Sequence, residues 1–294
     1  MIAFFANIFG YLLNFLYNIF QNYGIAIIIF SVVIKLILLP LSIKQNKTMK
    51  KTSKMQQELK SLQIKYKNNP EQLNKETMQL YKRENMSPFS GCFSAIVQLI
   101  LLFSVFYLVR SPLTYMRKID PQIIENYKKE ISVENTRNTY PEIKIIQKKG
   151  TEDSRVYINM EFLGLDLSSV PTQNTSDWKV FIIPALYIIS SIVSMKITTS
   201  MQTNKNKEVV IGEDGTPEVD PMEQANKSMS YFMPVMLLSV AAVAPLGLAL
   251  YWFVNNILMT VERLALNKFL KDELKGWHIC LKQRFFKEVL HQKL

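Results

Sequence analysis

The sequence predicts an all-α membrane protein with five transmembrane helices, a cytoplasmic helical hairpin and an N-terminal interfacial helix. Hydrophobic residues make up 48% of the 294 residues, and they gather in runs long enough, or nearly so, for the roughly 20 helical residues that cross a bilayer. The predicted segments are an interfacial helix at 1–22, spans at 23–41, 88–109, 178–197, 230–244 and 245–262, a hairpin at 42–87, an extracytoplasmic loop at 110–177, a linker at 198–229 and a basic tail at 263–294.

The distribution of basic residues predicts the orientation. The chain has a net charge of +11, yet no Lys or Arg precedes Lys35, whereas residues 42–85 contain eleven basic and four acidic residues. Because cytoplasmic loops are enriched in Lys and Arg, this loop is expected in the cytoplasm. Five spans then place the N-terminus outside and the tail inside. The tail agrees, since the residues from Glu262 onward include eight basic and four acidic ones.

The apolar segment 1–22 is predicted to lie in the outer membrane interface. Asn7, Gly10, Asn14 and Asn18 recur at helical spacing, opposite Phe, Ile, Leu and Tyr, as in an interfacial helix. The segment has neither a basic start nor a small-x-small cleavage site, so we expect it to be retained. An uncleaved signal anchor is the alternative, and it would reverse the topology. The basic loop that follows argues against it.

The segment between the first two spans has the pattern of two paired helices. Asn69 and Pro70 form a cap and a first helical position between two apolar stripes, and Ser87-Pro88 is expected to start the next span. The stripes are Met55, Leu59, Leu62 and Tyr66, then Leu73, Thr77 and Leu80. The lysine-rich outer faces fit a solvated surface near anionic lipid as well as they fit a docking surface for proteins.

The long loop at 110–177 is expected to contain a β-hairpin. Apolar residues alternate with other residues at Ile143 and Ile145 and again at Val156, Ile158 and Met160, which is the period of a strand. No catalytic or ligand motif occurs in this loop.

No metal site or cofactor is predicted. The two cysteines, Cys92 and Cys280, lie far apart in the chain, and His278 and His291 both fall in the tail without ligand spacing. Neither a disulfide framework nor a zinc site follows from such a pattern.

Lys35 interrupts an otherwise apolar span, Ile25 to Leu41. A lysine at the centre of a bilayer costs about 2.5 to 3.5 kcal/mol, so its presence indicates a functional site. The alternative is snorkelling to the cytoplasmic interface. Side chains in a helix tilt toward its N-terminus, which here points the ammonium away from the nearer interface, so the sequence favours a water-filled cavity.

Several polar residues in the other spans are candidates to line that cavity. They are Gln98 in the second span, Ser190, Ser191 and Ser194 in the third, and Asn255 and Asn256 beside Trp252 in the last. Each alone is explained by an interhelical hydrogen bond worth about 0.6 kcal/mol. Facing one cavity together with Lys35, they would form a wet groove. None is acidic, so Lys35 is expected to lack a counter-ion within the membrane.

Motifs along nearly the whole chain resemble the YidC/Oxa/Alb family of membrane protein insertases. They are Tyr23-Gly24 with Leu39-Pro40-Leu41, Lys44-Gln45, Pro70, Ser90-Gly91-Cys92-Phe93 with Gln98, Phe162-Leu163-Gly164-Leu165-Asp166-Leu167, Met233-Pro234-Val235-Met236 and Gly247-Leu248-Ala249-Leu250-Tyr251-Trp252. Lys35 stands where bacterial members most often have arginine, which keeps the charge but loses the bidentate fork. Ser94 and Ile100 replace prolines that are common in the family.

The resemblance implies a non-enzymatic insertase and chaperone of the bacterial cytoplasmic (inner) membrane. A hydrophilic groove with Lys35, Gln98, Ser190, Ser194, Tyr251, Trp252, Asn255 and Asn256 would receive nascent membrane proteins in the lipid bilayer. A ribosome, a targeting receptor and the Sec translocon are candidate partners, and no small-molecule substrate is implied. The alternatives are a small-anion transporter that uses Lys35, for which no internal repeat is found, and a structural membrane scaffold.

Overall fold

The computed structural model describes residues 1–84, 90–131, 140–202, 232, 236 and 239–291. Within them, three helical segments are long and apolar enough to cross a membrane, namely Ile2–Phe20, Tyr23–Thr48 and Trp178–Ser200, and a shorter apolar helix covers Ile96–Arg110. The expected all-α membrane protein is therefore confirmed at this level. The number of five spans and the orientation stay predictions.

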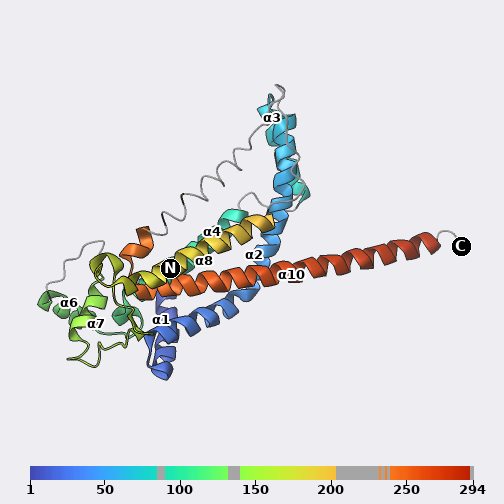
Figure 1. Cartoon of the computed structure of the whole chain (residues 1–294). Helices are drawn as coiled ribbons and strands as arrows, with labels where there is room; N and C mark the ends of the chain where they lie inside the picture. Colours follow the sequence, from blue (N-terminus) through green and yellow to red (C-terminus); the bar gives the residue numbers. More distant parts are fainter. Residues whose placement is uncertain (85–89, 132–139, 203–231, 233–235, 237–238, 292–294) are drawn as a thin grey trace.

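The first two helices meet at a sharp turn. Helix α1 (Ile2–Phe20) ends where Gln21 adopts a left-handed conformation with φ 49°, and helix α2 (Tyr23–Lys65) begins where the Asn22 side chain accepts a hydrogen bond from the backbone N–H of Ile25. Helix α2 continues past the predicted span into the predicted hairpin. Pro40 lies inside it and removes one backbone donor, which explains a change of direction such as the one Figure 1 shows along α2.

Helix α1 buries one face and exposes an apolar one. Gly10 is buried so closely that a Cβ atom there would lie 1.9 Å from the carbonyl oxygen of Tyr115. The exposed large side chains include Phe4, Ile8, Tyr11, Phe15 and Ile19. Figure 1 shows α1 running across the direction of α8 and α10, as an interfacial helix would. Because Ile2–Phe20 is also long enough to cross a membrane, the interfacial position stays a prediction.

Helix α3 (Pro70–Arg83) packs against the second half of α2. The Asn69 side chain accepts the Gln72 N–H and Pro70 takes the first helical turn. Met55 and Leu80 are buried, and Arg83 forms an ion pair with Glu58 of α2. The two helices therefore share an apolar seam and a charged contact. The predicted start of the next span at Ser87-Pro88 lies outside the described residues.

Three further long helices lie within the described residues. They are α4 (Ser90–Arg110), α8 (Ile182–Gln202), which follows the short 3-10 helix η2 (Trp178–Phe181), and α10 (Leu246–His291). Helices α8 and α10 lie side by side (Figure 1). A break at Ala244-Pro245 precedes α10, where the Leu246 N–H donates to the Ser169 carbonyl and the Gly247 N–H to that of Leu167. Most of the predicted span 230–244 and of the linker 198–229 lies outside the described residues.

The 110–177 region forms a small helical unit, in which the predicted β-hairpin is wrong. Its elements are α5 (Pro112–Tyr115), α6 (Pro121–Glu130), α7 (Pro141–Lys149), the two-residue strands β1 (Glu161–Phe162) and β2 (Leu165–Asp166), and the 3-10 helix η1 (Pro171–Gln173). Ile143 and Ile145 belong to α7, because Pro141 starts a helix and Ile146 adds the spacing of three to Ile143. Two residues at a spacing of two were too few to establish a strand.

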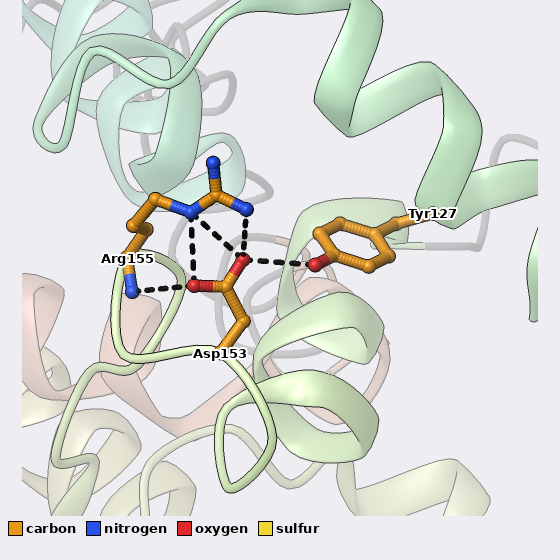
Figure 2. A network of polar contacts seen from close by, with 3 residues as sticks. All are labelled: Tyr127, Asp153 and Arg155. Atoms are coloured by element: carbon orange, nitrogen blue, oxygen red, sulfur yellow. Dashed lines mark hydrogen bonds and ion pairs between the residues drawn. The ribbon is translucent and has the colours of Figure 1, made fainter.

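Polar side chains hold the 110–177 region together. Asp153 accepts hydrogen bonds from the side chain and backbone of Arg155 and from the hydroxyl of Tyr127 (Figure 2). These donors, Arg155 foremost, hold the pKa of Asp153 well below its usual range. Glu142 is buried and accepts hydrogen bonds from the backbone and hydroxyl of Thr114 at 3.0 and 2.6 Å. Burial raises the pKa of the Glu142 carboxyl.

One hydrophobic core fixes this unit to the helices. Buried side chains of α1, α2, α4, α10 and the 110–177 region form a single cluster. Gly24 at the start of α2 lies under the ring of Phe162, and a Cβ atom there would come within 2.5 Å of that ring. The close approach explains the glycine. The unit is thereby held at the end of the bundle where α2 and α10 begin.

Candidate functional site

Lys35 of α2 forms an ion pair with Glu262 of α10. The Lys35 Nζ atom lies 3.2 Å from the Glu262 Oε2 atom, and the two side chains are 20% and 11% exposed. The prediction that Lys35 lacks an acidic partner is therefore wrong. The apolar run ends at Val261, and Glu262, the last residue of the predicted span 245–262, is counted among the charges of the tail. In the structure α10 continues through Glu262 without a break.

The ion pair satisfies only part of the Glu262 carboxylate. Two unit charges about 4 Å apart attract by about 4 kcal/mol at an effective dielectric constant of 20, and the loss of water from both groups offsets much of that gain. The Glu262 Oε1 atom is buried and has no hydrogen-bond partner within the part of the chain that the structure describes. One carboxylate oxygen thus remains as an unused acceptor beside Lys35.

A second polar contact joins α8 and α10, which we call the α8–α10 seam. Its hydrogen bonds run from Asn256 Nδ2 to Ser190 Oγ (2.9 Å) and Ser191 Oγ (3.2 Å), from Thr260 Oγ1 to Ser194 Oγ (2.8 Å), and from Arg263 Nη1 to Thr198 Oγ1 (2.7 Å). The partners advance by three or four residues on each helix, so they form one stripe per helix. The seam ties the two helices together with neutral hydroxyl and amide groups and one guanidinium.

Only some of the predicted site residues take part in these two contacts. Ser190, Ser194 and Asn256 lie in the α8–α10 seam. Asn255 is half-buried and lies seven residues before Glu262. That spacing is about two helical turns, which places Asn255 and Glu262 on one face of α10.

The remaining predicted residues lie near the seam or apart from it. Tyr251 is buried, and the Trp252 ring lies 5.7 Å from that of Tyr187 in a tilted arrangement. Gln98 is exposed on α4. None of the contacts described for these residues joins them to Lys35.

The sequence alone missed Glu262, Thr260, Arg263 and Thr198. A helical signal for two of them was present, because Thr260 and Arg263 follow the predicted residue Asn256 at spacings of four and three. Ending the last span at the first charged residue hid that stripe. Within the described residues, no group of three or more His, Cys, Asp or Glu side chains could hold a metal ion.

Comparison with known proteins gives consistent matches over most of the chain. A family model described as "60Kd inner membrane protein" matches residues 15–273. Among curated proteins, the "Membrane protein insertase YidC" of Treponema denticola is 27% identical over 89% of this chain, and that of Pelodictyon phaeoclathratiforme is 29% identical over 84%. The protein of the same name from Fusobacterium nucleatum is 26% identical over 88% of this chain.

The relatives differ in length. The chain spans 37% of the Treponema protein and 33% of the Pelodictyon protein, but 93% of the Fusobacterium protein. The residues matched by the family model, 15–273, include both Lys35 and Glu262.

Proposed function

Because this chain belongs to the 60Kd inner membrane protein family, we propose that it is a membrane protein insertase that helps nascent membrane proteins enter and fold in the bilayer. The observation that carries the proposal is a lysine placed on a helix long and apolar enough to cross a membrane, beside a charged partner and a stripe of polar groups. A purely structural helix has no need of such costly groups.

In the proposed mechanism, Lys35 lies in a hydrophilic groove and attracts acidic residues of the segment that must cross. Water and nearby polar side chains lower the cost of bringing a charged or polar segment into the membrane. Asn255, on the face of α10 that carries Glu262, and Gln98 and Trp252 are proposed to line the groove. The α8–α10 seam forms one wall, with Ser190, Ser194 and Asn256, and buried Tyr251 supports it from within.

The driving force is the transfer of the adjacent apolar segment into lipid. Burial of apolar area contributes about 25 cal/mol per Å², so a whole span far outweighs the attraction of one carboxylate to Lys35. The site therefore lowers a barrier, and no covalent chemistry is needed. Local thinning of the bilayer near short spans would lower the same barrier further.

The proposed orientation places the N-terminus outside and the C-terminus in the cytoplasm of a bacterial inner membrane. Helix α3, the second half of α2 and the extension of α10 would then lie in the cytoplasm. Their basic residues make them candidate contacts for ribosomal RNA through phosphate attraction, for a targeting receptor or for the Sec translocon. The 110–177 region would lie outside, over the closed end of the groove.

Depletion of the protein tests the proposal against the two alternatives. A single-span test protein with an acidic outer tail should lose most of its insertion when this protein is depleted, as protease protection of the tail would report. Normal insertion after depletion would contradict the proposal and leave the anion transporter or the scaffold.

Variants of Lys35 test the site itself in the same assay. K35A should insert the acidic-tailed protein poorly, whereas K35R should insert it well, because long-range attraction depends on charge. Full activity of K35A would show that Lys35 has no role in insertion.

A further inference from the structure

We infer that Glu262 is a specificity-determining residue of the Lys35 site: it competes with acidic residues of the crossing segment for Lys35, and it receives basic residues when the ion pair opens. The inference rests on the proposed insertase function and goes beyond it, because it extends the substrate class from acidic segments to segments of either charge.

Glu262 already occupies the place beside Lys35 that an acidic residue of a crossing segment would take. Its Oε2 atom lies 3.2 Å from the Lys35 Nζ atom, at the long end of the hydrogen-bond range. The pair joins helices whose residues are 227 positions apart in the chain. A carboxylate that approaches Lys35 from a crossing segment must therefore either displace Glu262 or share the ammonium with it.

Glu262 also offers an acceptor that the fold does not use. Its Oε1 atom is buried and has no hydrogen-bond partner among the described residues, and buried polar atoms without partners are rare in native structures. A lysine or arginine of a crossing segment would satisfy this atom. The site thus presents one cation and one anion side by side, and the pair has no net charge.

The neighbouring residue Arg263 faces another way. Its guanidinium donates to Thr198 Oγ1 at 2.7 Å and contacts the sulfur of Met259 at 3.7 Å. It therefore belongs to the α8–α10 seam, on the face of α10 toward α8. Replacing Glu262 should leave Lys35 as an unpaired cation at the α2–α10 contact.

The test uses the full chain reconstituted into vesicles of a zwitterionic phospholipid. Two test proteins with the same apolar span carry either an acidic or a basic outer tail, and the fraction of each tail protected from protease is measured. E262Q should raise the ratio of acidic-tailed to basic-tailed insertion by about threefold to tenfold, an effect the size of one partly exposed charge contact. K35Q should lower that ratio.

Two further variants separate charge selection from structure. K35E/E262K restores a neutral pair with its charges exchanged, and it should return the ratio to that of the unaltered protein. E130Q removes one carboxylate from the Lys149–Glu130 ion pair in the 110–177 region and should leave the ratio unchanged.

The outcomes distinguish a failure of the inference about Glu262 from a failure of the proposed insertase function. If the unaltered protein inserts both test proteins and E262Q leaves their ratio unchanged, or lowers both equally, the inference about Glu262 is wrong while the insertase function stands. If E262Q does not fold, an unchanged ratio in K35E/E262K still supports selection by the pair, and a shifted ratio overturns it. If vesicles with the unaltered protein insert no more than empty vesicles, the proposed function itself fails.

Discussion

Helix α10 makes polar contacts with two neighbouring helices, α8 and α2, and the two contacts differ in how fully their polar groups are paired. Toward α8, the helix presents Asn256, Thr260 and Arg263, and each finds a hydroxyl partner at 2.7 to 3.2 Å. Toward α2, it presents Glu262, whose one bonded oxygen meets Lys35 and whose other oxygen is buried without a described partner. The polar groups that α10 contributes to the seam are all hydrogen-bonded, whereas one oxygen of the ion pair has no partner among the described residues.

Under the proposed function, this difference separates a structural contact, the α8–α10 seam, from a functional one, the Lys35–Glu262 ion pair. Interhelical hydrogen bonds in membranes contribute about 0.6 kcal/mol each, so a few of them hold two helices together with little penalty. A half-buried ion pair adds little net stability over apolar residues of similar volume. A fold that needed only adhesion between α2 and α10 would therefore be served better by apolar side chains.

The largest expected effect comes from removing one charge of the pair. E262A leaves Lys35 half-buried without its partner, and it should lower the free energy of unfolding by about 2 kcal/mol, measured by thermal unfolding in detergent. The double variant K35M/E262M should recover most of that loss, because no charge remains to be desolvated. A double variant as unstable as E262A would mean that the pair itself stabilises the fold.

A smaller effect is expected from the seam. N256A removes the hydrogen bonds to Ser190 and Ser191 and should lower the free energy of unfolding by about 1 kcal/mol, as the same thermal measurement would show. N255A, on the adjacent position, is the matched control and should cost less. Equal losses in the two variants would contradict the assignment of Asn256 to the seam.

A smaller loss still is expected for T260V. This change keeps the shape of the side chain but removes the hydroxyl bonded to Ser194, so the midpoint of unfolding should fall by the equivalent of about 0.6 kcal/mol. S194A should cost a similar amount, and the double variant little more than either. Additive losses would show that the two hydroxyls do not act as a pair.

The smallest expected effect is a difference in salt dependence. Raising the ionic strength screens partly exposed charges, so the stability gap between the unaltered protein and K35M/E262M should change by a few tenths of a kcal/mol. The loss caused by T260V should stay constant, because its hydrogen bond joins neutral groups. A salt-dependent loss in T260V would contradict the distinction between a charged contact at Lys35 and a neutral one at Thr260.

Much of the helical framework could be predicted from hydropathy, but the pairing of charges could not. The apolar runs indicated α2, α4 and α8, and Lys35 was conspicuous because it is the only charged residue between Ile25 and Leu41. Its partner was not, because Glu262 follows the end of an apolar run and only the packing of α10 against α2 brings the two together. The contact depends on tertiary structure, which local patterns do not report.

Short patterns were the least reliable guide. Ile143 and Ile145 suggested a strand, yet Pro141 and the spacing to Ile146 favour the helix α7. In α1 the stripe that includes Gly10 predicted the polar face of an interfacial helix, whereas Gly10 is buried because it allows a close backbone contact at Tyr115. A small residue at helical spacing can therefore mark close packing as readily as it marks water.

The most direct test of the proposed site is photo-crosslinking to an arrested nascent chain. A photoreactive amino acid placed at Gln98 or Trp252, near the proposed path, should capture an acidic segment of a nascent membrane protein. The same probe at Phe15, on the exposed apolar face of α1, should capture lipid and little nascent chain. Equal capture at all three positions, or capture that K35A does not reduce, would contradict a path past Lys35.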